Sequence, residues 1–268
     1  MSFALGPALL FCPADRPERY AKALQRADAV ILDLEDAVAP RDKAAAREAL
    51  IGHPQDPERT IVRVNHAGTD DHELDLEAID STGYRYVMLA KVSGVRDLDR
   101  LGDYEVIALC ETAAGVVNAA AIAAVDAVVG LMWGAEDLVA SLGGSSSRRD
   151  DGAYRDVAAH ARSSVMLAAR ASGKAAIDAV HLDLADTAGL TAEARDAAAV
   201  GFTATACIHP DQVATVRAAY APSDEELAFA RAVLAAAEHE RGVFVFDGRM
   251  VDEPLLAHAR TVVSRRRE

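Results

Sequence analysis

Eight short apolar segments alternate with longer alanine-rich segments along residues 8–210 of this chain. The apolar segments have strand length, and the segments between them carry good helix formers and often begin after Pro, Asp or Thr, as helices do. The expected strands cover residues 8–13, 29–36, 60–65, 85–92, 105–112, 127–134, 174–183 and 203–210. This alternation predicts the α/β class and a closed (β/α)8 TIM barrel. An open doubly wound sheet is the alternative, but it usually has about five or six strands.

The chain continues well beyond the eighth expected strand. We expect helices at 211–220 and 224–241, an extended piece at 243–252 and a last helix toward the C-terminus. The expected domains are a barrel domain over residues 1–221 and a C-terminal helical extension over 222–268. The short segment 143–149, rich in Gly, Ser and Arg, is interpreted as a loop.

Charge and hydropathy exclude several classes of protein. The chain has 28 Lys and Arg against 42 Asp and Glu, a net charge of −14, which argues against nucleic-acid binding because phosphates require a basic surface. No apolar run approaches the ~20 residues of a membrane-spanning helix. The N-terminus also lacks the pattern of a signal peptide. We therefore expect a cytoplasmic protein that binds neither membranes nor nucleic acids.

The three cysteines lie far apart within apolar runs, with no CxxC spacing: Cys12, Cys110 and Cys207. This arrangement indicates neither a disulfide framework nor a zinc site. The simplest interpretation is that they are small buried side chains. A nucleophilic cysteine is the alternative, although no histidine or other base is adjacent in sequence.

Polar residues gather at the expected C-terminal ends of the strands, which ring the mouth of a barrel, where active sites are built. They are Asp33, Glu35, Asp36, Arg63, Asn65, Lys91, Glu111, Glu136, Asp137 and His209. Carboxylates that come singly from several strands, without His or Cys pairs, favour an oxygen-only site for Mg²⁺ or Mn²⁺, with Glu111 and Asp137 as the first-choice ligands. The alternative is that Glu136 or Asp137 caps the following helix. Arg63, between two valines, either is solvated on the outside of its sheet or faces an anion.

Seven segments together resemble a known family in their order and spacing: "LLFCPADRPERYAKA", "AVILDLEDAVAPRDKAAAR", "VRVN", "LCETAAGV", "WGAEDL", "CIHPDQV" and "DGRMVDEPLLAHA". The chain resembles the citrate lyase beta-subunit-like family of CoA-ester lyases from about residue 8 to 260. The likeness is close to the citramalyl-CoA and malyl-CoA lyases, within the 2-oxo-acid aldolase superfamily. The resemblance implies a Mg²⁺-dependent barrel and a homo-oligomer, expected to be a trimer.

The resemblance also implies roles for individual residues. Glu111 and Asp137 match the family's metal ligands, and Arg63 matches its substrate-anion arginine. Asp252 matches a catalytic acid/base that the C-terminal extension of a neighbouring subunit brings over the barrel mouth. Glu35 and Asp36 are expected to orient metal-bound waters or Arg63. The expected substrate contacts are Phe11, Lys22, Arg63, Glu111, Ala135, Ile208 and His209.

The implied reaction is Mg²⁺-dependent cleavage of a carbon–carbon bond in a 3-hydroxy-acyl-CoA. Citramalyl-CoA, malyl-CoA or 3-hydroxy-3-methylglutaryl-CoA would give acetyl-CoA and an oxo acid, and reverse condensation or thioester hydrolysis is open. The alternatives are the beta subunit of a citrate lyase complex acting on a citryl thioester, an aldolase of free 2-oxo acids, and a non-catalytic acyl-CoA-binding protein. Where the family often has "PKVES", this chain reads "AKVSG", so Lys91 receives no assigned role.

Overall fold

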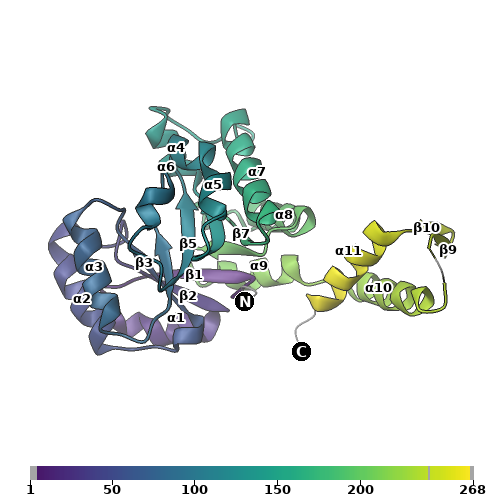
Figure 1. The fold of residues 1–268 in the computed structure, drawn as a ribbon, viewed down its shortest axis with the longest axis horizontal. Helices are drawn as coiled ribbons and strands as arrows, with labels where there is room; N and C mark the ends of the chain where they lie inside the picture. Colours follow the sequence, from purple (N-terminus) through teal and green to yellow (C-terminus); the bar gives the residue numbers. More distant parts are fainter. Residues whose placement is uncertain (1–4, 241, 266–268) are drawn as a thin grey trace. The chain divides into compact units, whose positions relative to one another are not determined.

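The computed structural model describes residues 5–240 and 242–265 of the chain. The chain divides into two compact units, Met1–Val216 and Arg217–Glu268. The ribbon in Figure 1 shows the elements of both units.

The first unit contains a closed barrel of eight parallel strands, in which each strand pairs with the next and β8 pairs with β1. The strands are β1 (Ala8–Pro13), β2 (Ala29–Asp33), β3 (Thr60–Val64), β4 (Tyr86–Leu89), β5 (Glu105–Cys110), β6 (Val128–Trp133), β7 (Ala175–Asp178) and β8 (Ala204–Cys207). The predicted TIM barrel is confirmed, and the open-sheet alternative is wrong. Most strands end a few residues earlier than expected, because their last polar residues leave the ladder and form the mouth.

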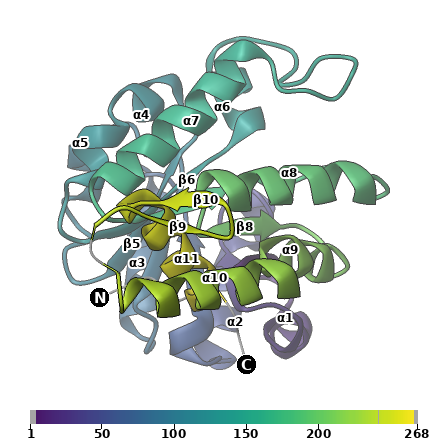
Figure 2. The same cartoon turned by 90° about the vertical axis from the view of Figure 1, so that its right-hand side faces the viewer.

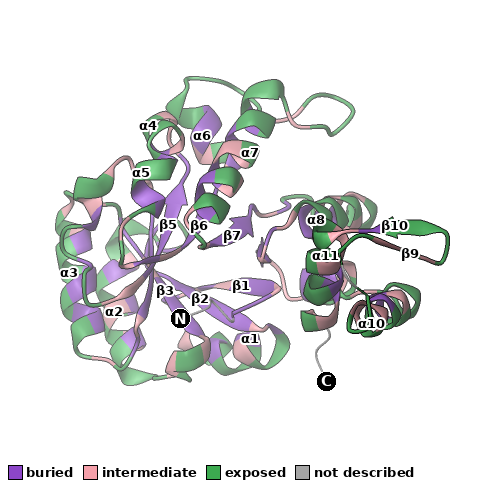
Figure 3. Ribbon diagram, turned by 45° about the vertical axis from the view of Figure 1, so that its right-hand side comes forward, coloured by how far each residue is buried: buried purple, intermediate pink, exposed green. Residues whose placement is uncertain are grey.

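Helices surround these strands, and their outer faces are exposed while the strands are buried (Figure 3). They are α1 (Tyr20–Arg26), α2 (Lys43–Gly52), α3 (Asp70–Asp80), α4 (Ala113–Val117), α5 (Ala119–Ala123), α6 (Ala135–Ser141), α7 (Asp156–Ala171), α8 (Thr187–Val200) and α9 (Gln212–Tyr220). Leu9, Ile31, Ile61, Met88 and Ile107 belong to the apolar cluster inside the barrel. This cluster closes the interior below the mouth.

The strand register determines which side chains meet at the mouth. In the β2–β3 pair, Asp33 stands opposite Arg63. In the β5–β6 pair, Cys110 stands opposite Trp133, so the residues that follow each strand, Glu111 and Gly134, are also neighbours. Parallel pairing therefore brings together residues that are about 20 to 30 positions apart in sequence.

The second unit contains α10 (Asp224–Ala237), the hairpin β9 (Phe244–Phe246) and β10 (Arg249–Val251), and α11 (Glu253–Ser264) (Figure 2). Ser223 and Glu226 form a reciprocal capping box at the start of α10, which satisfies amides that the helix leaves free. Leu227, Val233 and Val251 belong to a small apolar core of this unit. Within the described residues, none of the helices is long and apolar enough to cross a membrane.

Candidate active site at the barrel mouth

Arg63 is held inside the mouth by the neighbouring strand. Its Nε and Nη2 atoms donate to the two carboxylate oxygens of Asp33 at 2.7 and 2.5 Å, and Nη1 lies 3.3 Å from Glu35 Oε2. The guanidinium also lies 4.8 Å from the ring centre of Phe11. Burial opposes the charge, but the hydrogen bonds and charge of Asp33 raise the pKa of Arg63. The solvated-strand alternative is wrong, because Arg63 shares the inward face with Ile61, two residues earlier.

Glu111 directly follows β5 and is 3% exposed. Its Oε1 accepts a hydrogen bond from the backbone amide of Lys91 at 3.2 Å. A Cβ atom on Gly134 would lie 2.7 Å from Glu111 Oε2, so a glycine is needed where the carboxylate passes the β6–α6 junction. Burial and the negative charge of Asp137 raise the pKa of Glu111 to about 8, although Arg63 and Lys91 oppose this shift. A nearby cation would therefore stabilise the charged form of this carboxylate.

Asp137 lies in the first turn of α6, on the next strand–helix unit. The residue at the N-cap position is Gly134, and no side chain caps this helix. Asp137 Oδ1 instead lies 3.4 Å from Lys91 Nζ. The capping alternative is therefore wrong for Asp137. Glu136 does not cap α6 either, because its Oε1 accepts a hydrogen bond from Ser147 Oγ at 2.6 Å.

Glu35 and Asp36 form an acidic pair behind Arg63. Lys91 Nζ forms hydrogen bonds with both carboxylates, with a distance of 2.9 Å to Asp36 Oδ2. Burial raises the pKa of Glu35 against the opposing charges of Arg63 and Lys91. The pKa of Asp36 is lowered, because its hydrogen bond with Lys91 outweighs the effect of burial. The expected link between Glu35 and Arg63 is present, and Lys91 adds a second cation that sequence reasoning left without a role.

The oxygen donors of the mouth suit a hard divalent cation. Glu111 and Asp137 supply oxygen ligands from adjacent strand–helix units, as Mg²⁺ and Mn²⁺ prefer. Within the described residues, Glu111 forms no ion pair at salt-bridge distance, and no group of three or more His, Cys, Asp or Glu side chains has a metal-binding arrangement. Magnesium is commonly held by one or two protein carboxylates, waters and substrate oxygens. The two carboxylates therefore fit such an ion without a third protein carboxylate.

The other expected substrate contacts have different environments. Phe11 is partly buried against the barrel core and lies beneath Arg63. Ala135 begins α6 and is buried, whereas Lys22 is exposed on α1. Ile208 and His209 follow β8, and their backbone amides donate to Gln212 Oε1 at 2.9 and 3.2 Å. The barrel thus places Phe11 and Ala135 beside the acidic and basic groups of the mouth.

Asp252, the expected acid/base, belongs to the second unit. It is the N-cap residue of α11, and its Oδ1 accepts a hydrogen bond from Leu255 N at 3.1 Å. Asp and Asn serve equally well at this position because both side chains offer an oxygen acceptor. The local structure therefore explains a helix cap, and the role of Asp252 over a neighbouring mouth stays a prediction.

Three features of the mouth were missed or misplaced by sequence reasoning. Asp33 was placed at a strand end but not recognised as the main partner of Arg63, which the β2–β3 register brings opposite it. Asn65 was placed among the mouth residues, yet its side chain donates to Leu34 O at 3.0 Å and Asp75 Oδ2 at 2.7 Å. It therefore ties β2, β3 and α3 together. The sequence alone does not mark Gly134 as a site residue, and its importance is visible only once its closeness to Glu111 is known.

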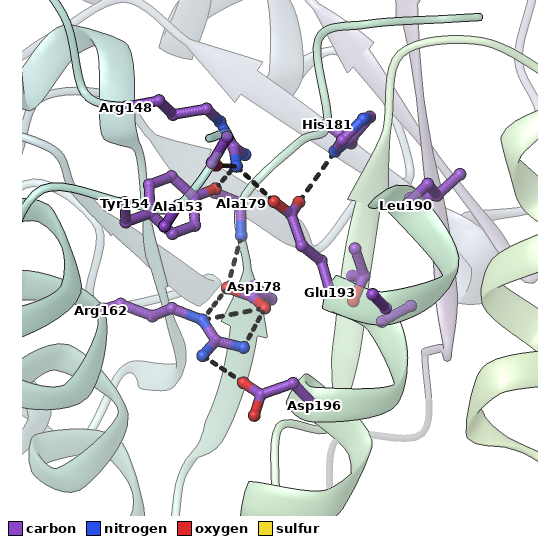
Figure 4. A pocket seen from close by; sticks show the side chains of 14 residues that line it. Arg148, Ala153, Tyr154, Arg162, Asp178, Ala179, His181, Leu190, Glu193 and Asp196 are labelled. Carbon is purple, nitrogen blue, oxygen red and sulfur yellow. Dashed lines mark hydrogen bonds and ion pairs between the residues drawn. The ribbon is translucent and has the colours of Figure 1, made fainter. Parts of the chain in front are cut away.

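A separate cavity of about 380 Å³ lies between the barrel wall and α7 and α8 (Figure 4). Its charged residues already bind one another: Arg162 with Asp178 and Asp196, and Arg148 with Glu193. None of the expected site residues lines it. Arg148 connects the 143–149 loop to α8 and stacks on Tyr154 at 4.0 Å, so this arginine has a structural role here. The mouth, where the charges of Glu111 and Arg63 interact, is the better candidate site.

The fold and the mouth define an enzyme of the barrel class with an acidic, arginine-bearing site. The family model described as HpcH/HpaI aldolase/citrate lyase matches residues 8–210. The chain belongs to this family and is an enzyme of a lyase family.

The chain is similar to curated proteins over nearly its whole length. A "citrate lyase subunit beta-like protein" of Mycobacterium tuberculosis is 62% identical over 262 residues, covering 98% of this chain and 96% of the relative. The mitochondrial citramalyl-CoA lyase of Homo sapiens is 32% identical over 291 residues, covering 96% and 84%.

Among the similar solved structures is one that matches this chain over almost its entire length. It is the protein CitE from Mycobacterium tuberculosis in complex with magnesium, acetoacetate and coenzyme A. Its TM-score is 0.93 with 61% sequence identity, and the match covers 98% of both chains. The backbone is therefore shared with a protein whose crystals held a divalent metal, an oxo acid and coenzyme A.

Proposed function

We propose that this protein is a Mg²⁺-dependent lyase that cleaves a 3-hydroxy-acyl-CoA to acetyl-CoA and an oxo acid. Citramalyl-CoA, malyl-CoA and 3-hydroxy-3-methylglutaryl-CoA are the substrate candidates. The observation that carries the proposal is the meeting of buried Glu111, Asp137 and the Asp33-held Arg63 at one barrel mouth. The complex of the similar CitE with magnesium, acetoacetate and coenzyme A supports the same ligand classes.

Glu111 and Asp137 would hold the Mg²⁺ ion, with Mn²⁺ as a substitute. When bound, the ion supplies positive charge beside oxygen atoms on which negative charge develops during cleavage. Glu111 is buried and Asp137 is partly exposed. A substrate that chelates the ion would therefore approach from the side of Asp137, which is open to solvent. Two carboxylates leave coordination positions for the hydroxyl and carboxylate or carbonyl oxygens of that substrate.

Arg63 would bind the anionic end of the substrate. Asp33 accepts from Nε and Nη2 and fixes the plane of the guanidinium, while hydrogen atoms on Nη1 and Nη2 stay available as donors. A fixed guanidinium binds a carboxylate or a developing oxyanion better than a mobile lysine does. Backbone amides near Ala135 would add further donors, and Phe11, Lys22, Ile208 and His209 would contact the thioester portion.

Cleavage transfers the hydroxyl proton of the substrate to solvent water, forms a carbonyl group, and breaks the bond to the carbon next to the thioester. The enolate of acetyl-CoA leaves and takes a proton on carbon. We assign this proton to Asp252 of a neighbouring subunit, in a homotrimer. In the condensing direction the same carboxylate would remove the proton, as microscopic reversibility requires.

The test is a panel of CoA esters assayed for acetyl-CoA release with Mg²⁺ and with EDTA. Citramalyl-, malyl- and 3-hydroxy-3-methylglutaryl-CoA are compared with citryl-CoA and with free 2-oxo acids. We expect Mg²⁺-dependent cleavage of at least one of the first three thioesters. Cleavage of the citryl thioester alone would favour the beta subunit of a citrate lyase. The 62% identical relative has the name "citrate lyase subunit beta-like protein". Thioester binding without turnover of any substrate would favour a non-catalytic binding protein.

A further inference from the structure

Lys91, the second residue after β4, has an unusual backbone conformation. Its φ angle is +56°, in the left-handed region that residues other than glycine rarely adopt. The neighbouring residues continue the strand pairing, because Ala90 N donates to Val64 O and Val92 N donates to Leu109 O. The strained conformation is thus confined to one residue at the mouth, where strain often accompanies function.

This conformation directs both ends of Lys91 toward the candidate metal ligands. The backbone amide donates to Glu111 Oε1 at 3.2 Å, and the ammonium lies 3.4 Å from Asp137 Oδ1. The same ammonium forms hydrogen bonds with Glu35 and Asp36. One residue in the loop after β4 therefore contacts carboxylates that follow β2, β5 and β6.

The charges explain why such a contact is needed. Asp33 is neutralised by Arg63 in a two-point ion pair. Glu35, Asp36 and Asp137 all have an oxygen atom within 3.4 Å of Lys91 Nζ. Without the ammonium, these three negative charges would repel one another and would leave a strongly negative potential beside the candidate metal ligands. The ammonium binds Glu35 and Asp36 most closely and lies farther from Asp137, at 3.4 Å, so Glu111 and Asp137 are the carboxylates that it engages least.

We propose that Lys91 is a positioning residue that acts as an internal cation and determines where the divalent metal binds. The ammonium holds Glu35 and Asp36 away from the metal, and the backbone amide orients Glu111. The inference rests on the proposed role of Glu111 and Asp137. The proposed role predicts that the charge of Lys91 weakens metal binding, because a positive charge beside a cation site repels the cation. A merely structural contact would have the opposite effect, because it would support metal binding.

The experiment measures Mn²⁺ binding to the full-length protein by calorimetry or electron paramagnetic resonance, without substrate. Lys91→Met introduces an unbranched side chain of nearly the same length and removes the charge, whereas Lys91→Arg is the matched control that keeps the charge. We expect Lys91→Met to bind Mn²⁺ at least about tenfold more tightly. It should also lose about 100-fold in turnover, because the ion is misplaced. Lys91→Arg should keep the wild-type dissociation constant.

A second arm tests the position of the ion. In the wild-type background, Glu111→Gln should abolish Mn²⁺ binding, whereas in the Lys91→Met background the same substitution should cost much less, since Glu35 and Asp36 become available. Wild-type or weaker Mn²⁺ binding by Lys91→Met would overturn the inference. Should Lys91→Met fail to fold, Lys91→Gly removes the same charge and adopts a positive φ without strain. If Glu111→Gln left Mn²⁺ binding to the wild-type chain intact, the proposed metal site itself would be wrong, separately from Lys91.

Discussion

Arg63 and Asp33 form the most deeply held ion pair of the mouth, with Asp33 1% exposed. Removing Asp33 takes away the two-point partner of a buried guanidinium and leaves it the 3.3 Å contact with Glu35, and breaking a buried pair in this way typically costs about 3–5 kcal/mol. We expect Asp33→Asn to lower the free energy of unfolding by this amount in urea titrations. The matched control is Asp156→Asn, which breaks the exposed Arg149–Asp156 pair and should change stability little, as surface pairs do. Equal effects of the two substitutions would contradict a structural role for the Asp33 pair.

Glu111 and Asp137 carry the metal-binding proposal. Glu111→Gln and Asp137→Asn keep the size of each side chain and remove a charged ligand that water replaces poorly. We expect each variant to lose Mn²⁺ binding and Mg²⁺-dependent turnover while its thermal unfolding stays cooperative. The control is Glu136→Gln, because Glu136 is adjacent in sequence but binds Ser147. Normal Mn²⁺ binding by either variant would remove that carboxylate from the metal site.

At the scale of elements, the junction of β6 and α6 matters as much as the side chains around it. An added methyl group on Gly134 would lie 2.7 Å from the Glu111 carboxylate and 3.0 Å from its Cβ. We expect Gly134→Ala to displace Glu111 and weaken Mn²⁺ binding, measured by calorimetry, with the helix content retained. Gly52→Ala is the control, since nothing lies within 4 Å of its added methyl group. Unchanged metal binding in Gly134→Ala would show that Glu111 can move without loss.

The strands also explain the inertness expected of the cysteines. Cys12, Cys110 and Cys207 are all buried. Burial raises the pKa of Cys12 to about 11 and that of Cys110 to about 12, so at pH 8 neither forms the nucleophilic thiolate to a useful extent. We expect iodoacetamide to leave the native protein unlabelled at pH 8 and to label all three cysteines in urea, as counted by mass spectrometry. Rapid labelling of Cys12 or Cys110 in the native protein would instead support the alternative that this cysteine is a nucleophile.

At the scale of the whole molecule, the proposed active site combines two subunits. Asp252→Asn keeps the α11 cap and removes the titratable proton, so we expect normal metal binding and a loss of about 10²–10⁴-fold in cleavage. Arg63→Ala should also be inactive. Mixed oligomers of the two variants should regain activity, because some neighbours would combine an intact barrel with an intact Asp252. Lack of recovery after subunit exchange verified by mass spectrometry would contradict the shared site.

The sequence alone determined the barrel and the residue types at its mouth. The alternation of apolar and alanine-rich segments reflects local periodicity, which each segment carries by itself, so the eight strands and the strand-end carboxylates were predictable. The partners of those side chains were decided only by the tertiary structure. Asp33 meets Arg63 through strand register, and Lys91 reaches carboxylates after three other strands through one left-handed residue. Such contacts depend on barrel closure and side-chain direction, which arise from packing between segments that are distant in the chain.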